Sequence, residues 1–314
     1  MIRVFQSVAG VLNETEELCG GRWIHAVCPT PDEIAAIHKT LDIPEECAAA
    51  PLNLETRPYV QRYDPEGALL VVLRVPSLES PHLSPRQNTM PFAIAVSPRE
   101  HVVTISPVDT GVASEIVNSN WQIYSTDYPS QLALRIFLIA ARQFIERVRA
   151  LYREFEDVEA MFEESQRNED AIALLNLQKR LAYYIKALQG NEAVLERLRR
   201  TQLLRAIPEE DRALLEDAIS ETRLAAKMAE TAADFLNQTM SAFNSIVSNN
   251  LNAVMRFLAV VTLVLTIPTL LAGLFGMNVR LPLQESPYGF ALILCLSALL
   301  SGGALIWLKR KHKL

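Results

Sequence analysis

A stripe of small and uncharged polar side chains recurs at helical spacing near the C-terminal end of this 314-residue sequence. Its members alternate at steps of three and four residues, so a helix presents them on one face. Coiled-coil seams carry Leu, Ile or Val at such positions, whereas hydroxyls, amides and small side chains suit a water-filled pore for an ion that keeps its water. The stripe consists of Gln238, Ser241, Ser245, Ser248, Asn252, Met255, Ala259, Thr262, Thr266, Thr269, Gly273 and Gly276.

The same stripe has a second interpretation, which is close packing. Small residues let membrane helices approach each other, and Ser or Thr hydroxyls can bond the backbone of their own helix. The length of the stripe favours the pore, and several copies of the chain are then needed around an axis. Met255 and Leu258 suit an apolar constriction that gates by expelling water, or simple packing between helices. The predicted pore-lining residues are Asn252, Met255, Leu258, Thr262, Thr266, Thr269 and Gly273.

Two apolar segments must position this stripe. Phe257–Val279 and Ser286–Leu308 each contain 23 residues without a charged side chain, and about 20 residues suffice to cross a bilayer as a helix. We therefore predict a transmembrane domain over 256–314, with spans over about 256–276 and 288–308.

Basic residues set the expected orientation of the spans. Arg256 precedes the first span and the run Lys309–Lys313 follows the second, whereas the link between them carries Arg280 alone. Positive residues favour the cytoplasmic side, so both termini are expected in the cytoplasm. The first ten residues have no long apolar run of the signal-peptide kind. A multi-pass protein of the inner (plasma) membrane is expected.

The composition of the remaining chain excludes several function classes. Six of the 30 basic residues but only one of the 36 acidic residues lie after residue 255, so residues 1–255 carry a net charge of −11. Nucleic acid, which needs a basic face, is not an expected partner, whereas metal cations are. The four cysteines have no CxxC spacing. The sequence shows no catalytic constellation and no glycine-rich phosphate loop, so neither an enzyme nor an organic cofactor is expected.

Residues 1–128 are predicted to form a cytoplasmic α/β domain. Short apolar runs separated by turn residues predict strands. Thr30, Pro31 and Glu33 form a capping-box pattern that predicts a helix start, and a second helix is expected near Pro44. The predicted strands are Ile2–Phe5, Trp23–Val27, Leu69–Val75, Phe92–Val96 and Val102–Ile105.

Residues 129–255 are predicted to form a stalk of long helices. Between Pro129 and Met255 this segment contains Pro208 as its one further proline and Gly190 as its one glycine. Helical spacing predicts helices over about 130–165 and 169–203, and a third that continues from about 209 into the first span. Helices this long with narrow apolar stripes must pack on each other or on other subunits.

The first span ends in Phe275-Gly276-Met277-Asn278, and here the chain resembles the CorA family of divalent-cation channels. The signature of that family is an aromatic residue followed by Gly-Met-Asn at the outer end of the first of two spans. The long helix that enters the first span and the terminal basic run agree with this. The resemblance covers the whole architecture and is strongest over about 245–314.

The resemblance implies a funnel-shaped homopentamer with five cytoplasmic α/β domains and five long helices that descend to the axis. Gly276, Met277 and Asn278 would form the outer mouth and selectivity filter. Magnesium dehydrates reluctantly, so a ring of Asn278 amides and backbone carbonyls would accept hydrogen bonds from its shell water. Mg²⁺ would be both the transported ion and a regulator.

In the family, acidic residues between neighbouring cytoplasmic domains bind magnesium and hold the channel shut. Asp217 is spaced from the signature as the helix acid of the family is, and Asp64 or Glu66 would be its partner across the interface. The alternative for all three is a solvated surface carboxylate.

The sequence also departs from the family pattern. Val279 replaces a bulky residue after the signature, and Leu283 stands where the outer loop usually carries a glutamate. Cation attraction at the mouth is therefore expected to be weaker. Met277, which changes in zinc-transporting relatives such as ZntB, is unchanged here, which favours magnesium but leaves zinc, cobalt and nickel open.

Two alternative functions differ from a magnesium channel. The first is a proton-coupled, ZntB-like zinc transporter, but the stripe carries none of the His, Cys or carboxylate ligands that zinc prefers. The second is a membrane-anchored signalling protein, which would have ordinary apolar residues on the face of Thr262.

Overall fold

The structure of the chain is a computed structural model. Two units can be distinguished within it, Met1–Asn237 and Gln238–Leu314, and helix α6 (Glu209–Phe275) contributes residues to both. The domain boundaries predicted after residues 128 and 255 stay predictions. The structure describes residues 1–8, 11–15, 23–63, 67–77, 88–97, 99, 101–118, 129–165, 168–201, 209–277 and 288–310.

A seven-stranded sheet organises the first unit, with strand order β2-β1-β3-β7-β6-β5-β4. Strands β3 and β7 are parallel and every other neighbouring pair is antiparallel. The five predicted strands are confirmed, whereas β2 and β4 were not predicted. The strands are β1 (Ile2–Val8), β2 (Val11–Thr15), β3 (Trp23–Val27), β4 (Tyr59–Tyr63), β5 (Ala68–Pro76), β6 (Thr89–Val96) and β7 (Val102–Ser106).

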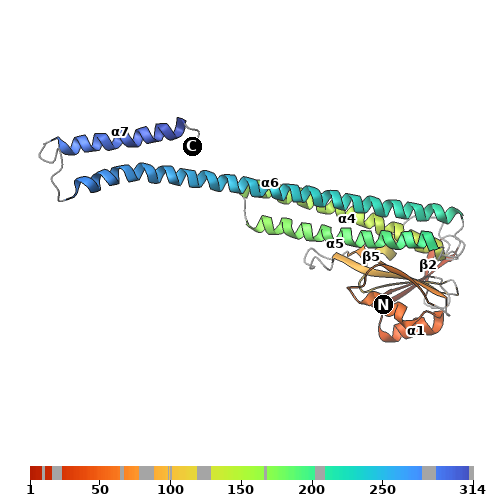
Figure 1. The fold of residues 1–314 in the computed structure, drawn as a ribbon. Helices are drawn as coiled ribbons and strands as arrows, with labels where there is room; N and C mark the ends of the chain where they lie inside the picture. The colour runs from red at the N-terminus through yellow and green to blue at the C-terminus, as the bar shows by residue number, and fades with distance from the viewer. Residues whose placement is uncertain are drawn as a thin grey trace. The chain divides into compact units, whose positions relative to one another are not determined.

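The two faces of the sheet support two hydrophobic cores. Side chains alternate along a strand, so Leu69, Val71 and Leu73 of β5 enter one core, while Leu70 and Val72 enter the other. Figure 1 shows the long helices across the first face and α1 on the second. The short helices are α1 (Pro31–Leu41), α2 (Glu45–Ala49), the 3-10 turn η1 (Ala50–Leu52) and α3 (Val112–Asn118).

The predicted start of α1 is confirmed. The backbone N–H of Glu33 donates to Thr30 Oγ1 over 3.3 Å, and the N–H of Thr30 donates to Glu33 Oε2 over 2.8 Å. This reciprocal pair satisfies two donors that a helix N-terminus otherwise leaves free. Helix α2 begins at Glu45, directly after Pro44, as the sequence predicted.

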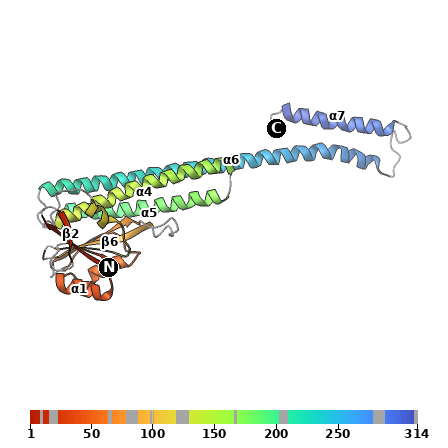
Figure 2. The same cartoon turned by 180° about the vertical axis from the view of Figure 1, so that it is seen from behind.

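The three predicted long helices are also confirmed as α4 (Pro129–Ser165), α5 (Asn168–Thr201) and α6. They lie side by side in both views (Figures 1 and 2). The Asn191 side chain binds helix α5 to the sheet, because it accepts from the N–H of Arg74 over 2.9 Å and donates to the carbonyl of Arg74 over 2.7 Å. The predicted fold class, an α/β domain with long helices and two C-terminal helices, is confirmed.

Gly190 allows this close approach of α5. A Cβ atom at Gly190 would lie 2.8 Å from Pro58 Cγ, well inside ordinary contact distance. The proline ring cannot rotate away, so a larger residue would push α5 from the sheet. This contact explains why glycine interrupts an otherwise glycine-free helical segment.

His25 belongs to the core of the sheet. Its Nδ1 lies 2.9 Å from Thr104 Oγ1, which also accepts a hydrogen bond from Trp23 Nε1 over 3.0 Å. Burial lowers the pKa of His25 to about 4, because desolvation disfavours the charged form. The side chain is therefore neutral at pH 7 and supports packing.

Candidate functional site

Two helices of the described residues are long and apolar enough to cross a membrane. They are α6, over Arg212–Phe275, and α7 (Gly289–Arg310). Helix α7 runs back alongside the second half of α6 (Figures 1 and 2). Both predicted spans thus correspond to helices, and they place the stripe on the apolar half of α6.

One face of the α6 span is partly covered within the single chain. Val260, Val264, Ile267 and Leu271 are half-buried there, although most other side chains of the span are exposed. Helix α7 contacts this face, since Ser301 Oγ donates to the carbonyl of Val264 over 3.3 Å. Ser301 was not singled out from the sequence, and its position as a hydroxyl in an apolar span is the signal that was missed.

The stripe lies on the opposite face of α6. A helix turns by about 100° per residue, which puts Thr262, Thr266 and Gly273 roughly 180° around the helix from Val264. These stripe residues and Thr269 are exposed. Packing against α7 therefore does not account for the stripe. Both interpretations, a pore or close packing, require another copy of the chain.

The three threonine hydroxyls of the stripe are bonded within their own helix. Thr262, Thr266 and Thr269 each donate to the backbone carbonyl four residues earlier, over 2.8, 2.7 and 2.8 Å. A hydroxyl has one donor and two acceptor lone pairs. Because the donor is used by the backbone, each oxygen offers only acceptors to its surroundings. Acceptors are what the shell water of a cation needs.

An open groove runs along the stripe. Its volume is about 590 Å³. A Cβ atom at Gly273 would meet nothing within 4 Å, so no contact within the described chain requires glycine there. The groove of the stripe is lined by Thr262, Leu265, Thr266, Thr269, Leu270, Gly273, Leu274 and Met277.

The signature begins where α6 ends. The N–H of Gly276 still bonds the carbonyl of Ala272 over 2.9 Å, and the N–H of Met277 bonds the carbonyl of Leu274 over 3.4 Å in a tighter turn. A Cβ atom at Gly276 would lie 3.2 Å from the oxygen of Ala272, so glycine relieves crowding at this turn. Asn278 and the link between the spans lie outside the described residues.

The predicted constriction lies on the same helix. Met255 and Leu258 are 59% and 52% exposed, so the single chain leaves both side chains uncovered. Asn252 is also exposed, and its carbonyl accepts a hydrogen bond from Arg256 Nε over 3.2 Å. A ring formed by several copies would bring Met255 and Leu258 together, which one chain does not.

The predicted regulatory acids are not brought together in one chain. Asp217 is exposed on α6 and makes no ion pair with any residue that the structure describes. The neighbouring Glu216 differs, because Arg199 lies 3.4 Å from it. Asp64 and Glu66 lie outside the described residues. Among the described side chains, no group of three or more His, Cys, Asp or Glu residues can hold a metal ion.

Comparisons with known proteins agree with this architecture. The sequence model of the family described as "CorA-like Mg2+ transporter protein" matches residues 20–310. The cobalt/magnesium transport protein CorA of Methanocaldococcus jannaschii is 34% identical over 124 residues, 39% of either chain. The mitochondrial inner membrane magnesium transporter MRS2 of Candida albicans is 30% identical over 139 residues, 41% of this chain and 30% of MRS2. These matches thus span less than half of either relative.

Solved structures share the fold. The complete structure of the CorA magnesium transporter from M. jannaschii has a TM-score of 0.86 at 22% identity, over 100% of this chain and 99% of that one. The cytoplasmic domain of ZntB from Vibrio parahaemolyticus has a TM-score of 0.60 at 12% identity, over 79% of this chain and 98% of that domain. At these identities the likeness shows the fold alone.

Proposed function

The chain belongs to the CorA-like Mg²⁺ transporter family, and from this premise we propose that it conducts hydrated Mg²⁺ into the cytoplasm through a homopentamer. The observation that carries the proposal is the position of the stripe on the face of α6 that α7 leaves open. Five such faces around an axis form an uncharged pore lined by hydroxyls and amides. The family consists of transporters, so the activity is transport without a chemical reaction.

The chemistry of the wall fits a hydrated magnesium ion. Mg²⁺ prefers octahedral oxygen coordination and gives up its water reluctantly. The hydroxyl oxygens of Thr262, Thr266 and Thr269, whose donors are bonded to the backbone, accept hydrogen bonds from that water. Gly276, Met277 and Asn278 form the filter at the outer mouth. Met255 and Leu258 form the apolar gate.

The same proposal assigns the location and the control of the channel. Both termini and the first unit lie on the cytoplasmic side of the inner (plasma) membrane, and the link between α6 and α7 lies outside. Cytoplasmic Mg²⁺ binds between subunits at Asp217, with Asp64 or Glu66 of the neighbour, and favours the closed state.

Uptake by liposomes that contain the purified protein tests the transported ion. We expect Mg²⁺ to enter down its gradient without a proton gradient, and the rate with Co²⁺, Ni²⁺ or Zn²⁺ outside to be lower. A fluorescent indicator inside the vesicles measures each ion. Zinc uptake that depends on a proton gradient, without magnesium uptake, would contradict the proposal and favour a zinc transporter.

Cysteine labelling tests the pore wall. In a chain whose four native cysteines are replaced by alanine, Thr262→Cys, Thr266→Cys and Thr269→Cys are expected to react with small water-soluble thiol reagents. Reaction needs an accessible thiolate, so the matched controls Val264→Cys and Leu271→Cys, on the face towards α7, are expected to react about tenfold more slowly. Reaction at the three stripe positions as slow as at the controls, measured by mass spectrometry in the assembled protein, would mean that the stripe is packed and dry.

A further inference from the structure

Helix α6 continues through a proline in its apolar half. Pro268 lies inside the helix, which ends only at Phe275. Proline has no backbone N–H, and its ring crowds the carbonyl four residues earlier. The carbonyl of Val264 therefore lacks the donor that residue 268 would supply in a regular helix. A carbonyl without a donor is costly within a bilayer, so the span needs another donor at this point.

The second span supplies that donor. Ser301 Oγ of α7 donates to the carbonyl of Val264 over 3.3 Å. The Ser301 side chain is only 9% exposed, and Val264 is half-buried on the face of α6 opposite the stripe. Water in the proposed pore would therefore not reach this carbonyl. In membrane proteins, Ser and Thr side chains of neighbouring helices commonly bond backbone groups that a proline has freed.

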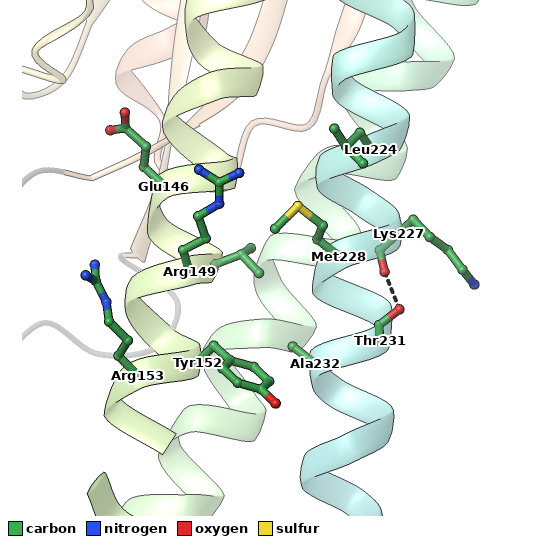
Figure 3. Close-up of a pocket in the computed structure, with 10 residues that line it drawn as sticks. Glu146, Arg149, Tyr152, Arg153, Leu224, Lys227, Met228, Thr231 and Ala232 are labelled. Atoms are coloured by element: carbon green, nitrogen blue, oxygen red, sulfur yellow. Dashed lines mark hydrogen bonds between the residues drawn. The ribbon is translucent and has the colours of Figure 1, made fainter. Parts of the chain in front are cut away.

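Other hydroxyls of α6 bond the backbone in a different way. Figure 3 shows Thr231, whose hydroxyl donates over 2.9 Å to the carbonyl of Lys227 on the same helix. Residue 231 also has a backbone N–H for that carbonyl, which has two lone pairs, so the hydroxyl is a second donor. The stripe threonines follow the same pattern. Ser301 instead comes from another helix and bonds a carbonyl whose helical donor is missing.

The missing helical bond lies in the middle of the stripe. Thr262 and Thr266 precede Pro268, and Thr269 follows it. A helix bends where its bond ladder is interrupted by proline. The direction in which the two halves of the stripe face therefore depends on the segment from Val264 to Pro268. Helix α7 is bonded to this same segment, so it can fix the bend.

We propose that Ser301 is a positioning residue for transport. Its hydroxyl replaces the donor that Pro268 lacks, and it fixes the bend of α6 so that both halves of the stripe face the pore. Ser301 lies on the side of α6 away from the stripe, so it acts through the helix and not on the ion. The inference rests on the proposed function, because it assigns Ser301 a role in shaping the pore.

A pair of backgrounds tests whether Ser301 acts through the freed carbonyl. Ser301→Ala leaves the carbonyl of Val264 without a donor, and we expect the rate of Mg²⁺ uptake into liposomes to fall by about fivefold or more. Pro268→Ala restores the N–H at residue 268. On that background, Ser301→Ala is expected to change uptake by less than about twofold. Equal losses on the two backgrounds would mean that Ser301 only fills space.

Two further serine variants are the matched controls. Ser301→Thr keeps a hydroxyl at the same position, and its uptake is expected to stay within about twofold of the starting protein. Ser297 lies one turn earlier on α7, is half-buried and makes no hydrogen bond with α6 among the described residues. Ser297→Ala is therefore expected to leave uptake unchanged. Normal uptake in Ser301→Ala, or an equal loss in Ser297→Ala, would overturn the positioning role.

Thermal unfolding in detergent follows the hydrogen bond without reference to transport. We expect Ser301→Ala to lower the unfolding midpoint by about 2 °C in the starting protein and by less than about 1 °C on the Pro268→Ala background. Equal shifts on the two backgrounds would contradict the bond between Ser301 and Val264. A starting protein that shows these shifts but takes up no Mg²⁺ would instead overturn the proposed function.

Discussion

Asn278→Ala is expected to lower Mg²⁺ uptake by more than about tenfold, while the protein still assembles in the membrane. The resemblance places Asn278 in the filter, where neither Gly276 nor Met277 has a side-chain oxygen. Removing the amide therefore removes the side-chain acceptor for the shell water of the ion and leaves only backbone carbonyls, and a partly satisfied ion at a constriction does not pass. Uptake into liposomes and the oligomeric state in detergent are the two measurements.

A second asparagine provides the control for this variant. Asn250 is exposed on α6 but lies outside the stripe, so Asn250→Ala deletes the same amide from another face. Its uptake is expected to equal that of the starting protein. Normal uptake by a correctly assembled Asn278→Ala protein would contradict the assignment of Asn278 to the selectivity filter.

Asp217→Lys is expected to uncouple gating from cytoplasmic magnesium. A ligand that binds only the closed state stabilises it by linkage, so Mg²⁺ at Asp217 would hold the channel shut. Lysine puts a tethered cation at each of the subunit interfaces. The channel then stays shut if the charge mimics the ion, or leaks if the site is only disrupted, and in both cases added Mg²⁺ no longer matters.

Limited proteolysis measures this effect directly. We expect the additional protection of the first unit that Mg²⁺ provides to shrink by more than about tenfold in Asp217→Lys, whether the variant channel stays shut or leaks. Glu216→Lys is the matched control, since Glu216 is already paired with Arg199 in the same chain. Unchanged protection and unchanged magnesium-dependent closure in Asp217→Lys would mean that Asp217 is a solvated surface carboxylate and not a regulatory magnesium ligand.

Local patterns explain which elements could be predicted. The capping box of Thr30 and Glu33 is complete within four residues, and the long helices repeat their pattern over many turns. Strands β2 and β4 were missed because they are the two edges of the sheet. Their sequences, VLNET and YVQRY, carry polar residues that an edge tolerates, so neither forms a continuous apolar run.

Some features of the candidate site could likewise be predicted from the sequence, whereas others could not. The stripe was predictable because helical periodicity alone puts Thr262, Thr266 and Thr269 on one face. Which face α7 covers was not predictable, since it depends on contacts such as Ser301 with Val264, 37 residues away. The contact of Gly190 with Pro58 also joins distant parts of the chain. The partners proposed for Asp217 on another subunit would depend on assembly and follow from no pattern in one chain.

The backbone bonds of the three stripe threonines also bear on how the proposed pore would reject anions. Thr262, Thr266 and Thr269 have given their one donor to the helix, so they have nothing to offer an anion. Discrimination between cations and anions along this stretch then needs no fixed charge. Salt screens charges over about 10 Å at 0.1 M, but it does not reverse the direction of a hydrogen bond. Hydroxyls do not titrate near neutral pH. The preference of the threonine-lined pore for cations over anions is therefore expected to persist at high ionic strength and low pH, conditions that would weaken the preference of a ring of carboxylates.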